Sequence, residues 1–153
     1  MGLTEKPIVD IKLDGIDRTR FRINGDSNAI IELDLSDLNI SDRLEKGLTQ
    51  LDEYVAELAK LPKDDENLSN VLKDVDNKMR ESIDYIFSYP VSEVCAKYGT
   101  MFDLKDGKFR YESIIDGLTK LYTNNLNEEY KKLNNRIKKH TAKYTAKTNK
   151  KVK

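Results

Sequence analysis

The sequence lacks several residue types and patterns on which common protein classes depend. It contains no tryptophan and a single cysteine in 153 residues, so an internal disulfide is excluded. No apolar run approaches the roughly 18 residues of a membrane-spanning helix. The opening "MGLTEKPIVD" has no apolar core of a secretory signal. We therefore expect a soluble, intracellular protein with no membrane partner.

Residues that usually carry catalysis are scarce as well. The only histidine, His140, lies in a basic stretch that offers no fixed partner, and Cys95 has the helical spacing of a packed apolar face. A calcium loop centred on Gly107 fails, because its first and third positions are Phe102 and Leu104. Phosphate-loop, zinc-protease and nucleophile-elbow motifs are absent. We expect no enzyme and no catalytic residue, cofactor or metal site.

Apolar residues are also few, and charged residues are many. Hydrophobic residues make up 38% of the chain and charged residues 35%. Such a composition favours a narrow core built from helices that each bury one stripe.

The first third of the chain alternates as strands do. "IVDIKL" (8–13), "TRFRI" (19–23) and "AIIELDL" (29–35) each place apolar residues on alternate positions. "NGDSN" (24–28) between the last two contains Asn-Gly, a strong hairpin turn. The pattern predicts two or three antiparallel strands.

A helical period begins near residue 36. Ser36, Ser41 and Asp42 are candidate N-caps, and Asp42 with Glu45 resembles a capping box. Pro62 ends the segment, because proline lacks the N–H that a helix needs. A heptad stripe runs between these limits: Leu44, Leu48, Leu51, Val55 and Leu58.

A second stripe follows "KDDEN" (63–67), whose acids are expected at a helix start. Its members are Leu68, Val71 or Leu72, Val75, Met79, Ile83 and Ile86. The segment extends to Pro90. Two helices of about twenty residues joined by a short polar turn predict an antiparallel hairpin that needs further cover.

The remaining chain predicts smaller helical elements and a tail. Ser92 is expected to cap a short helix that ends at Gly99, with an inner face of Val91, Val94, Cys95 and Tyr98. "DLKDG" (103–107) predicts a turn, after which a longer helix starts near Phe109 or Tyr111 and can continue through Ile137. From about residue 140 no apolar stripe remains, and we expect a flexible tail.

Together these patterns predict an α+β fold that is mostly α. We divide it into a small β unit (1–35), a helical hairpin (36–89), C-terminal helices (90–139) and a flexible basic tail (140–153), with one compact domain over 1–139.

The tail separates charge within a neutral chain. Residues 131–153 carry ten Lys or Arg and no acid, so residues 1–130 hold the remaining 17 basic groups against all 27 acidic groups. A partner protein with an acidic surface is our first interpretation, self-association the second, and nucleic acid the third, because the acidic body would repel a polyanion.

The order of features resembles a known family. A hairpin leads into "IELDLSDLNISDRLEKGLTQLDEYVAEL", then come "MRESIDYIFSYPVSEVCAKYG" and "FRYESIIDGLTKLY", and a Lys/Asn-rich end closes the chain. This order is similar to the tail assembly chaperones of long-tailed phages and prophages of Gram-positive bacteria. The resemblance implies a cytoplasmic, non-enzymatic protein of the bacterial host that binds the helical tape measure protein.

Candidate partner-binding residues follow from both arguments. They are Leu44, Leu48, Leu51, Val55 and Leu58 of the first stripe, and Lys131, Lys132, Arg136, Lys138, Lys139 and Lys143 of the tail. A phage structural or scaffolding subunit, present in the virion, is the alternative function, and a nucleic-acid-binding protein is a weaker one.

Overall fold

The computed structural model describes residues 5–14, 17–64 and 66–152, and the side chains of residues 140 and 143–152 lie outside the description. In chain order the elements are β1 (Thr19–Arg22), β2 (Ile30–Leu33), α1 (Ile40–Ala59), α2 (Leu68–Phe87), α3 (Val91–Cys95), β3 (Leu104–Lys105), β4 (Lys108–Phe109) and α4 (Arg110–Val152).

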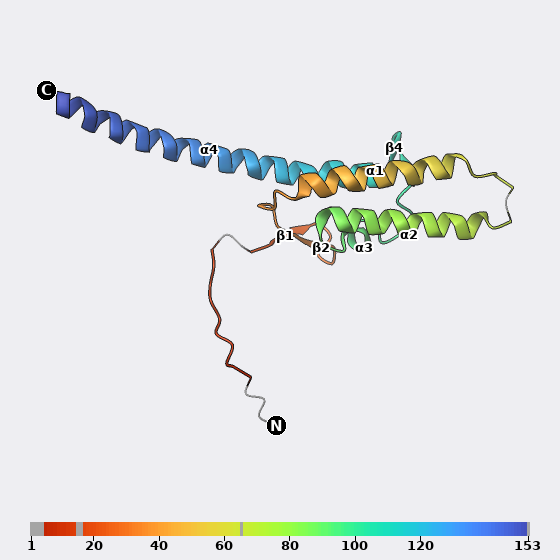
Figure 1. Cartoon of the computed structure of the whole chain (residues 1–153). Helices are drawn as coiled ribbons and strands as arrows, with labels where there is room; N and C mark the ends of the chain where they lie inside the picture. The colour runs from red at the N-terminus through yellow and green to blue at the C-terminus, as the bar shows by residue number, and fades with distance from the viewer. Residues whose placement is uncertain (1–4, 15–16, 65, 153) are drawn as a thin grey trace.

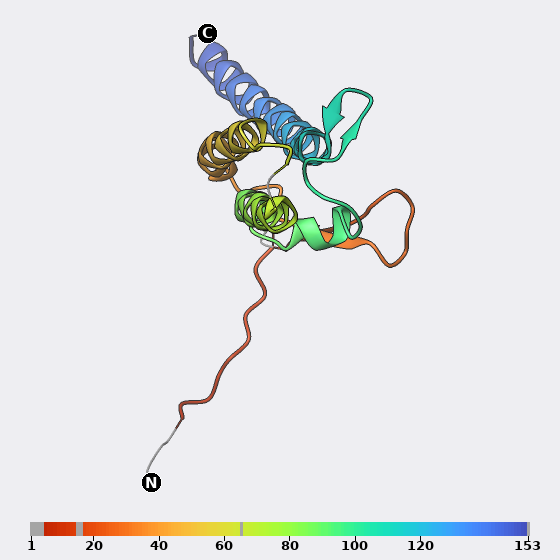
Figure 2. The same ribbon diagram turned by 90° about the vertical axis from the view of Figure 1, so that its right-hand side faces the viewer.

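The architecture is a helical hairpin of α1 and α2 with the first half of α4 laid along it (Figure 1). The end-on view shows these three helices in cross-section, with α3 and the β1–β2 hairpin at the side of α2 (Figure 2). The second half of α4 extends beyond the ends of α1 and α2 (Figure 1). The expected α+β, mostly helical fold is confirmed.

The N-terminal sheet is the predicted hairpin. β1 and β2 pair antiparallel with Phe21 opposite Ile31, and Asn24 and Gly25 form the turn with positive φ values of 50° and 74°. Ile31 and Leu33 point to one face of β2 and are fully buried. The sheet therefore contributes a short apolar row to a core that is otherwise helical.

The predicted strand over residues 8–13 was wrong. Within the described part of the chain this segment is outside the two sheets, and Ile8 and Val9 are 94% and 79% exposed. Alternation makes a segment compatible with a sheet, but a strand forms only where a neighbour takes up its hydrogen bonds. The hairpin remains two-stranded.

The two heptad stripes form the α1–α2 seam as predicted. Leu51 of α1 and Met79 and Ile83 of α2 are fully buried. Gly47 is buried too, and a Cβ at this position would lie 2.4 Å from Cγ1 of Ile86. The glycine thus allows a close approach of the two helices at the Ile86 end of the seam.

Helix starts differ from the prediction. α1 begins after Asn39, whose side chain makes no capping hydrogen bond, so Ser36, Ser41 and the Asp42–Glu45 box do not cap it. Asp34 and Asp37 instead accept hydrogen bonds from the backbone N–H groups two residues on, in Asx turns that lead into the helix. The acids of "KDDEN" precede α2, whose first turn contains none.

The short third helix is also smaller than expected. α3 ends at Cys95, and Ser92 lies inside it, with a buried side chain. Tyr98, predicted on its inner face, is 79% exposed. Carbonyl oxygens beyond the helix bind arginine side chains instead of continuing the helix: Tyr98 accepts from Arg110 and Gly99 accepts from Arg80.

α4 extends further than expected. It continues to Val152, where a flexible tail from about residue 140 was predicted. A helix satisfies its own backbone hydrogen bonds and needs no apolar stripe for them. Lysine and alanine are good helix formers, and cations near a C-terminus interact favourably with the helix dipole. A polar segment can therefore continue a helix that the core has already nucleated.

The close approach at Gly47 gives a testable expectation. Gly47→Ala should lower the free energy of unfolding by about 1 kcal/mol, because overpacking costs about 1–3 kcal/mol and exceeds the helix-propensity gain of about 1 kcal/mol. Gly117→Ala is the matched control, since it lies in α4 and a Cβ there meets nothing within 4 Å. Urea denaturation should show that variant stabilised. A stabilised Gly47→Ala variant would contradict the packing described.

Candidate protein-binding surface

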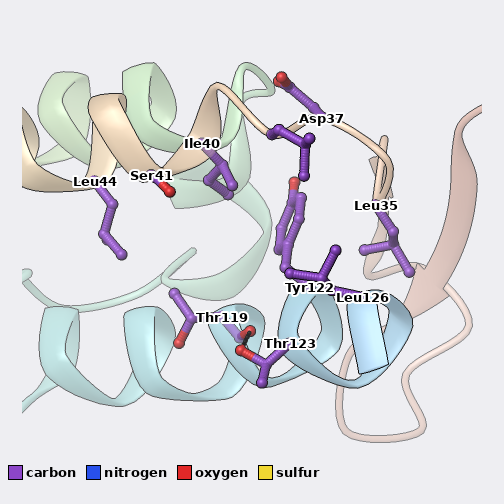
Figure 3. Close-up of a pocket in the computed structure, with 10 residues that line it drawn as sticks. Leu35, Asp37, Ile40, Ser41, Leu44, Thr119, Tyr122, Thr123 and Leu126 are labelled. Atoms are coloured by element: carbon purple, nitrogen blue, oxygen red, sulfur yellow. Dashed lines mark hydrogen bonds between the residues drawn. The ribbon is translucent and has the colours of Figure 1, made fainter. Parts of the chain in front are cut away.

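An apolar groove lies where the segment entering α1 meets the middle of α4. One side is lined by the apolar residues Leu35, Leu38, Ile40 and Leu44 with the polar Asp37 and Ser41, and the other by Thr119, Tyr122, Thr123 and Leu126. Figure 3 shows Ile40 and Leu44 coming from α1 and facing the α4 side chains across the groove. We call it the α1–α4 groove.

Hydrogen bonds fix the wall that residues 34–39 form. Arg43 donates from Nε to the carbonyl of Ile86 at 2.9 Å, and from Nη2 to Asp37 Oδ2 at 2.7 Å. Asn125 of α4 donates from Nδ2 to the carbonyl of Leu35 at 3.3 Å. The segment is thus tied to both α2 and α4, and it holds Leu38 in place although that side chain is 71% exposed.

Tyr122 connects the groove to the core. Its ring stacks on Phe87, with centroids 6.3 Å apart and planes at 30°. Burial raises the pKa of Tyr122 to about 12, so the phenol stays neutral at physiological pH. Tyr122 therefore contributes an uncharged aromatic ring to the base of the groove.

The apolar face of α4 continues past the groove into the protruding half of the helix. Leu126, Tyr130, Leu133 and Ile137 follow one another at steps of four, three and four residues. They are 38%, 55%, 41% and 52% exposed. We call these four residues the free stripe. Heptad spacing on an exposed helix is the pattern that packs against another helix.

Opposite charges flank the free stripe. A second hollow is lined by the charged residues Glu129, Lys132 and Arg136 together with Leu38, Leu126, Tyr130 and Leu133. The α1–α4 groove and this hollow share Leu38 and Leu126, so they form one continuous surface along α4.

The predicted partner-binding stripe of α1 occupies a different place. Leu51 is fully buried, and Leu44, Leu48, Val55 and Leu58 are half-buried against the core. These side chains cover α2 and α4 in this structure, because a hairpin of two stripes buries each against the other. Leu44 alone of the five lines the α1–α4 groove.

The predicted cations lie on the protruding half of α4. Lys131, Lys132, Arg136, Lys138 and Lys139 are exposed, whereas the side chain of Lys143 lies outside the described residues. Two of them form intrahelical ion pairs: Lys131 with Glu128 and Lys132 with Glu129, each at 3.4 Å. Exposed pairs of this kind add little stability, so these charges remain available to a partner.

Cys95 is a packed thiol in this structure. It is half-buried against the core, and burial, with a smaller contribution from the nearby Asp84 charge, raises its pKa to about 11. The side chain of His140 lies outside the description. Among the side chains that are described, no group of three or more His, Cys, Asp or Glu residues is arranged to hold a metal ion.

Asp84 fixes the start of α3. Its carboxylate accepts hydrogen bonds from the Ser92 backbone N–H at 2.8 Å and from the Ser92 hydroxyl at 3.0 Å. Burial nevertheless raises the pKa of Asp84, because desolvation outweighs these two bonds. Asp103 behaves in the opposite way: hydrogen bonds from Thr100 lower its pKa. The two carboxylates thus respond to pH with opposite sign.

The groove was missed from the sequence for a physical reason. Leu38 lies in the turn before α1 and Ile40 is the first residue of the helix, and both fall outside the heptad stripe. The continuation of the α4 pattern through Tyr130, Leu133 and Ile137 was seen. Whether a periodic residue is covered depends on where the other helices end, and periodicity does not encode this.

No helix in the described part of the chain has both the length and the apolar character to cross a bilayer. The chain matches no known family model, and neither curated proteins nor solved structures give a significant match.

The packing of Cys95 predicts a slow thiol. At pH 8 only about a thousandth of a thiol with a pKa near 11 is ionised, and the thiolate is the reactive form. An aromatic disulfide reagent should therefore modify the native protein at least about 100-fold more slowly than the urea-unfolded protein. The unfolded sample must release one equivalent, since the chain has one cysteine. Fast native modification would contradict the packed position.

Asp84 and Asp103 should change the folding stability in opposite directions as the pH rises. The pKa of Asp84 is raised above its ordinary value of 3.8 in the folded state. As the pH rises above 3.8, Asp84 therefore loses its proton in the unfolded protein before it does so in the folded protein. The free energy of unfolding falls over the pH range between the two pKa values. Asp84→Asn should remove this loss. The stability of wild type relative to the variant should therefore decrease with pH.

Asp103 provides the internal control. Its lowered pKa gives stability that is present above 3.8 and is lost as pH falls through the folded-state value. Relative to Asp103→Asn, wild type should therefore gain stability as pH rises. Urea titrations from pH 3 to 7 measure both slopes, and slopes of the same sign would contradict the assignment.

Proposed function

We propose that this chain is a non-enzymatic assembly chaperone that binds an amphipathic helix of a client protein on the α1–α4 groove and the free stripe. In line with the family it resembles, the client is the tape measure protein of a long-tailed phage. The protein acts in the cytoplasm of the bacterial host and keeps apolar client helices covered until tail subunits assemble around them.

The observation that carries the proposal is the continuous apolar surface on α4. Leu126, Leu133 and Ile137 of α4 are partly exposed, and the exposed Leu38, which precedes α1, lines the same hollow as Leu126 and Leu133. Amphipathic helices bind such grooves through residues spaced by three and four. The hydrogen bonds of Arg43 and Asn125 hold the surface in one arrangement, so a client would not have to order it first.

The flanking charges fit a client helix of mixed charge. The protruding half of α4 presents exposed cations, and Lys132 and Arg136 line the hollow beside the free stripe. Acidic residues flanking the apolar face of a client helix would pair with them. These contacts would add orientation and association rate more than affinity.

Co-expression with the tape measure protein of the same genome tests the proposal. Wild type should keep that protein soluble and copurify with it. Leu38→Glu combined with Leu133→Glu should abolish the complex, because two charges would enter the apolar surface. Both side chains are exposed, 71% and 41%, so the fold should survive, as circular dichroism would show.

Leu104→Glu is the matched control. Leu104 is 67% exposed but lies on β3, away from the groove. The control should keep full chaperone activity. A complex that survives the double change, or is lost equally in the control, would contradict the groove as the binding site.

A second candidate function rests on the exposed basic half of α4. A structural or scaffolding subunit would dock these cations on an acidic capsid or tail protein and would stay in the virion. Mass spectrometry of purified particles separates the two: an assembly chaperone is absent from mature particles and a structural subunit is present.

A further inference from the structure

The edges of the free stripe carry a charge pattern that selects one way of pairing. Glu129 and Arg136 immediately precede Tyr130 and Ile137 and lie on one edge. Asn127 and Asn134 immediately follow Leu126 and Leu133 and lie on the other edge. In paired helices, the residues at these edge positions meet across the seam and decide partner and orientation.

Antiparallel pairing of two copies satisfies this pattern. If Leu126 of one helix faces Ile137 of the other, Tyr130 faces Leu133, and the four-residue stripe is covered in both copies. The edge that carries Glu129 and Arg136 then meets the same edge of the second copy. Glu129 of each copy comes beside Arg136 of the other, giving two opposite-charge contacts, and the asparagines meet on the second edge.

Parallel pairing does not satisfy the pattern. Opposite edges would then meet, which places Glu129 opposite Asn134 with no charge to pair. It would also bring two segments of ten cations and no acids side by side, and like charges repel.

We propose that the free stripe is a self-association surface that binds a second copy of this chain as an antiparallel helix pair. The arrangement also brings opposite net charges together. Lys138 and Lys139 lie beyond Ile137, so they approach the end of the second copy's groove, where Asn125 holds the segment that contains Asp34 and Asp37.

The pair also covers the most exposed part of the surface. Leu38 and Leu126 line the same hollow, so Ile137 of the second copy, facing Leu126, shields Leu38 as well. With four large side chains from each helix, the contact is short. We expect a reversible, concentration-dependent dimer that weakens with salt, because charge contacts contribute to it.

The inference goes beyond the proposed function and stands without it. Self-association needs no client. If both hold, a client helix competes with the second copy for the free stripe, and the dimer is a resting state that client binding opens.

Two charge-reversal variants test the pairing. Glu129→Arg makes both edge positions basic, and Arg136→Glu makes both acidic, so each variant alone should dimerise about tenfold more weakly than wild type. An equimolar mixture of the two should recover dimers, because every edge contact in the mixed pair is again between opposite charges. Sedimentation equilibrium over a range of concentrations measures the dissociation constant of the dimer for wild type, for each variant and for the mixture.

A matched pair controls for net charge. Glu128→Arg and Lys131→Glu make the same reversals on the outer side of the helix, where Glu128 and Lys131 form a 3.4 Å ion pair like that of Glu129 and Lys132. These variants should dimerise like wild type, alone and mixed.

Three outcomes would overturn the proposal: a wild-type chain that stays monomeric at millimolar concentration, seam variants that dimerise like wild type, or control variants that match the seam variants. None of these bears on client binding, because the charge-reversal variants keep every apolar residue of the α1–α4 groove and the free stripe. The Leu38 and Leu133 changes are expected to weaken the dimer as well, since Leu133 belongs to the free stripe. Conversely, a wild-type chain that forms dimers but no complex with the tape measure protein would leave this proposal intact and contradict the proposed function.

Discussion

α4 is much longer than the α1–α2 hairpin that covers it, and the rest of the structure depends on this difference in length. The apolar face of α4 starts with buried Tyr111, Ile114 and Leu118, which complete the core of the α1–α2 hairpin. The same face continues to Ile137 in sequence, and the second half of α4 extends beyond the ends of α1 and α2 (Figure 1). One half of a single helix face therefore stabilises the fold, and the other half stays partly exposed.

Charge is distributed along the same axis. The basic end of the chain lies on the protruding half of α4, while the acids are confined to the first 130 residues. An exposed apolar stripe in a neutral, uniformly charged protein would invite nonspecific association. The basic segments of two copies would repel each other if they lay parallel, whereas an acidic surface would be attracted to them.

Much of the fold followed from local patterns. The Asn-Gly turn, the two heptad stripes and Pro62 predicted the hairpins because each acts over a few residues. The failures were non-local. Residues 8–13 have a strand's alternation without a strand to pair with, and α3 ends early, with Arg80 and Arg110 bound to carbonyl groups beyond it. The apolar stripe of α1 was proposed for a partner; in the structure Leu51 is fully buried and the other four side chains are half-buried against the core. The exposed surface depends on where helices end in space, which periodicity alone does not give.

Amide hydrogen exchange along α4 tests the central claim most directly. The account predicts that residues 110–125 are protected to the same degree at every protein concentration, since the body of the same chain covers them. It predicts that protection of residues 126–137 rises with concentration or on addition of a client helix. Equal protection of both halves in dilute protein, or protection of 126–137 that never changes, would contradict it.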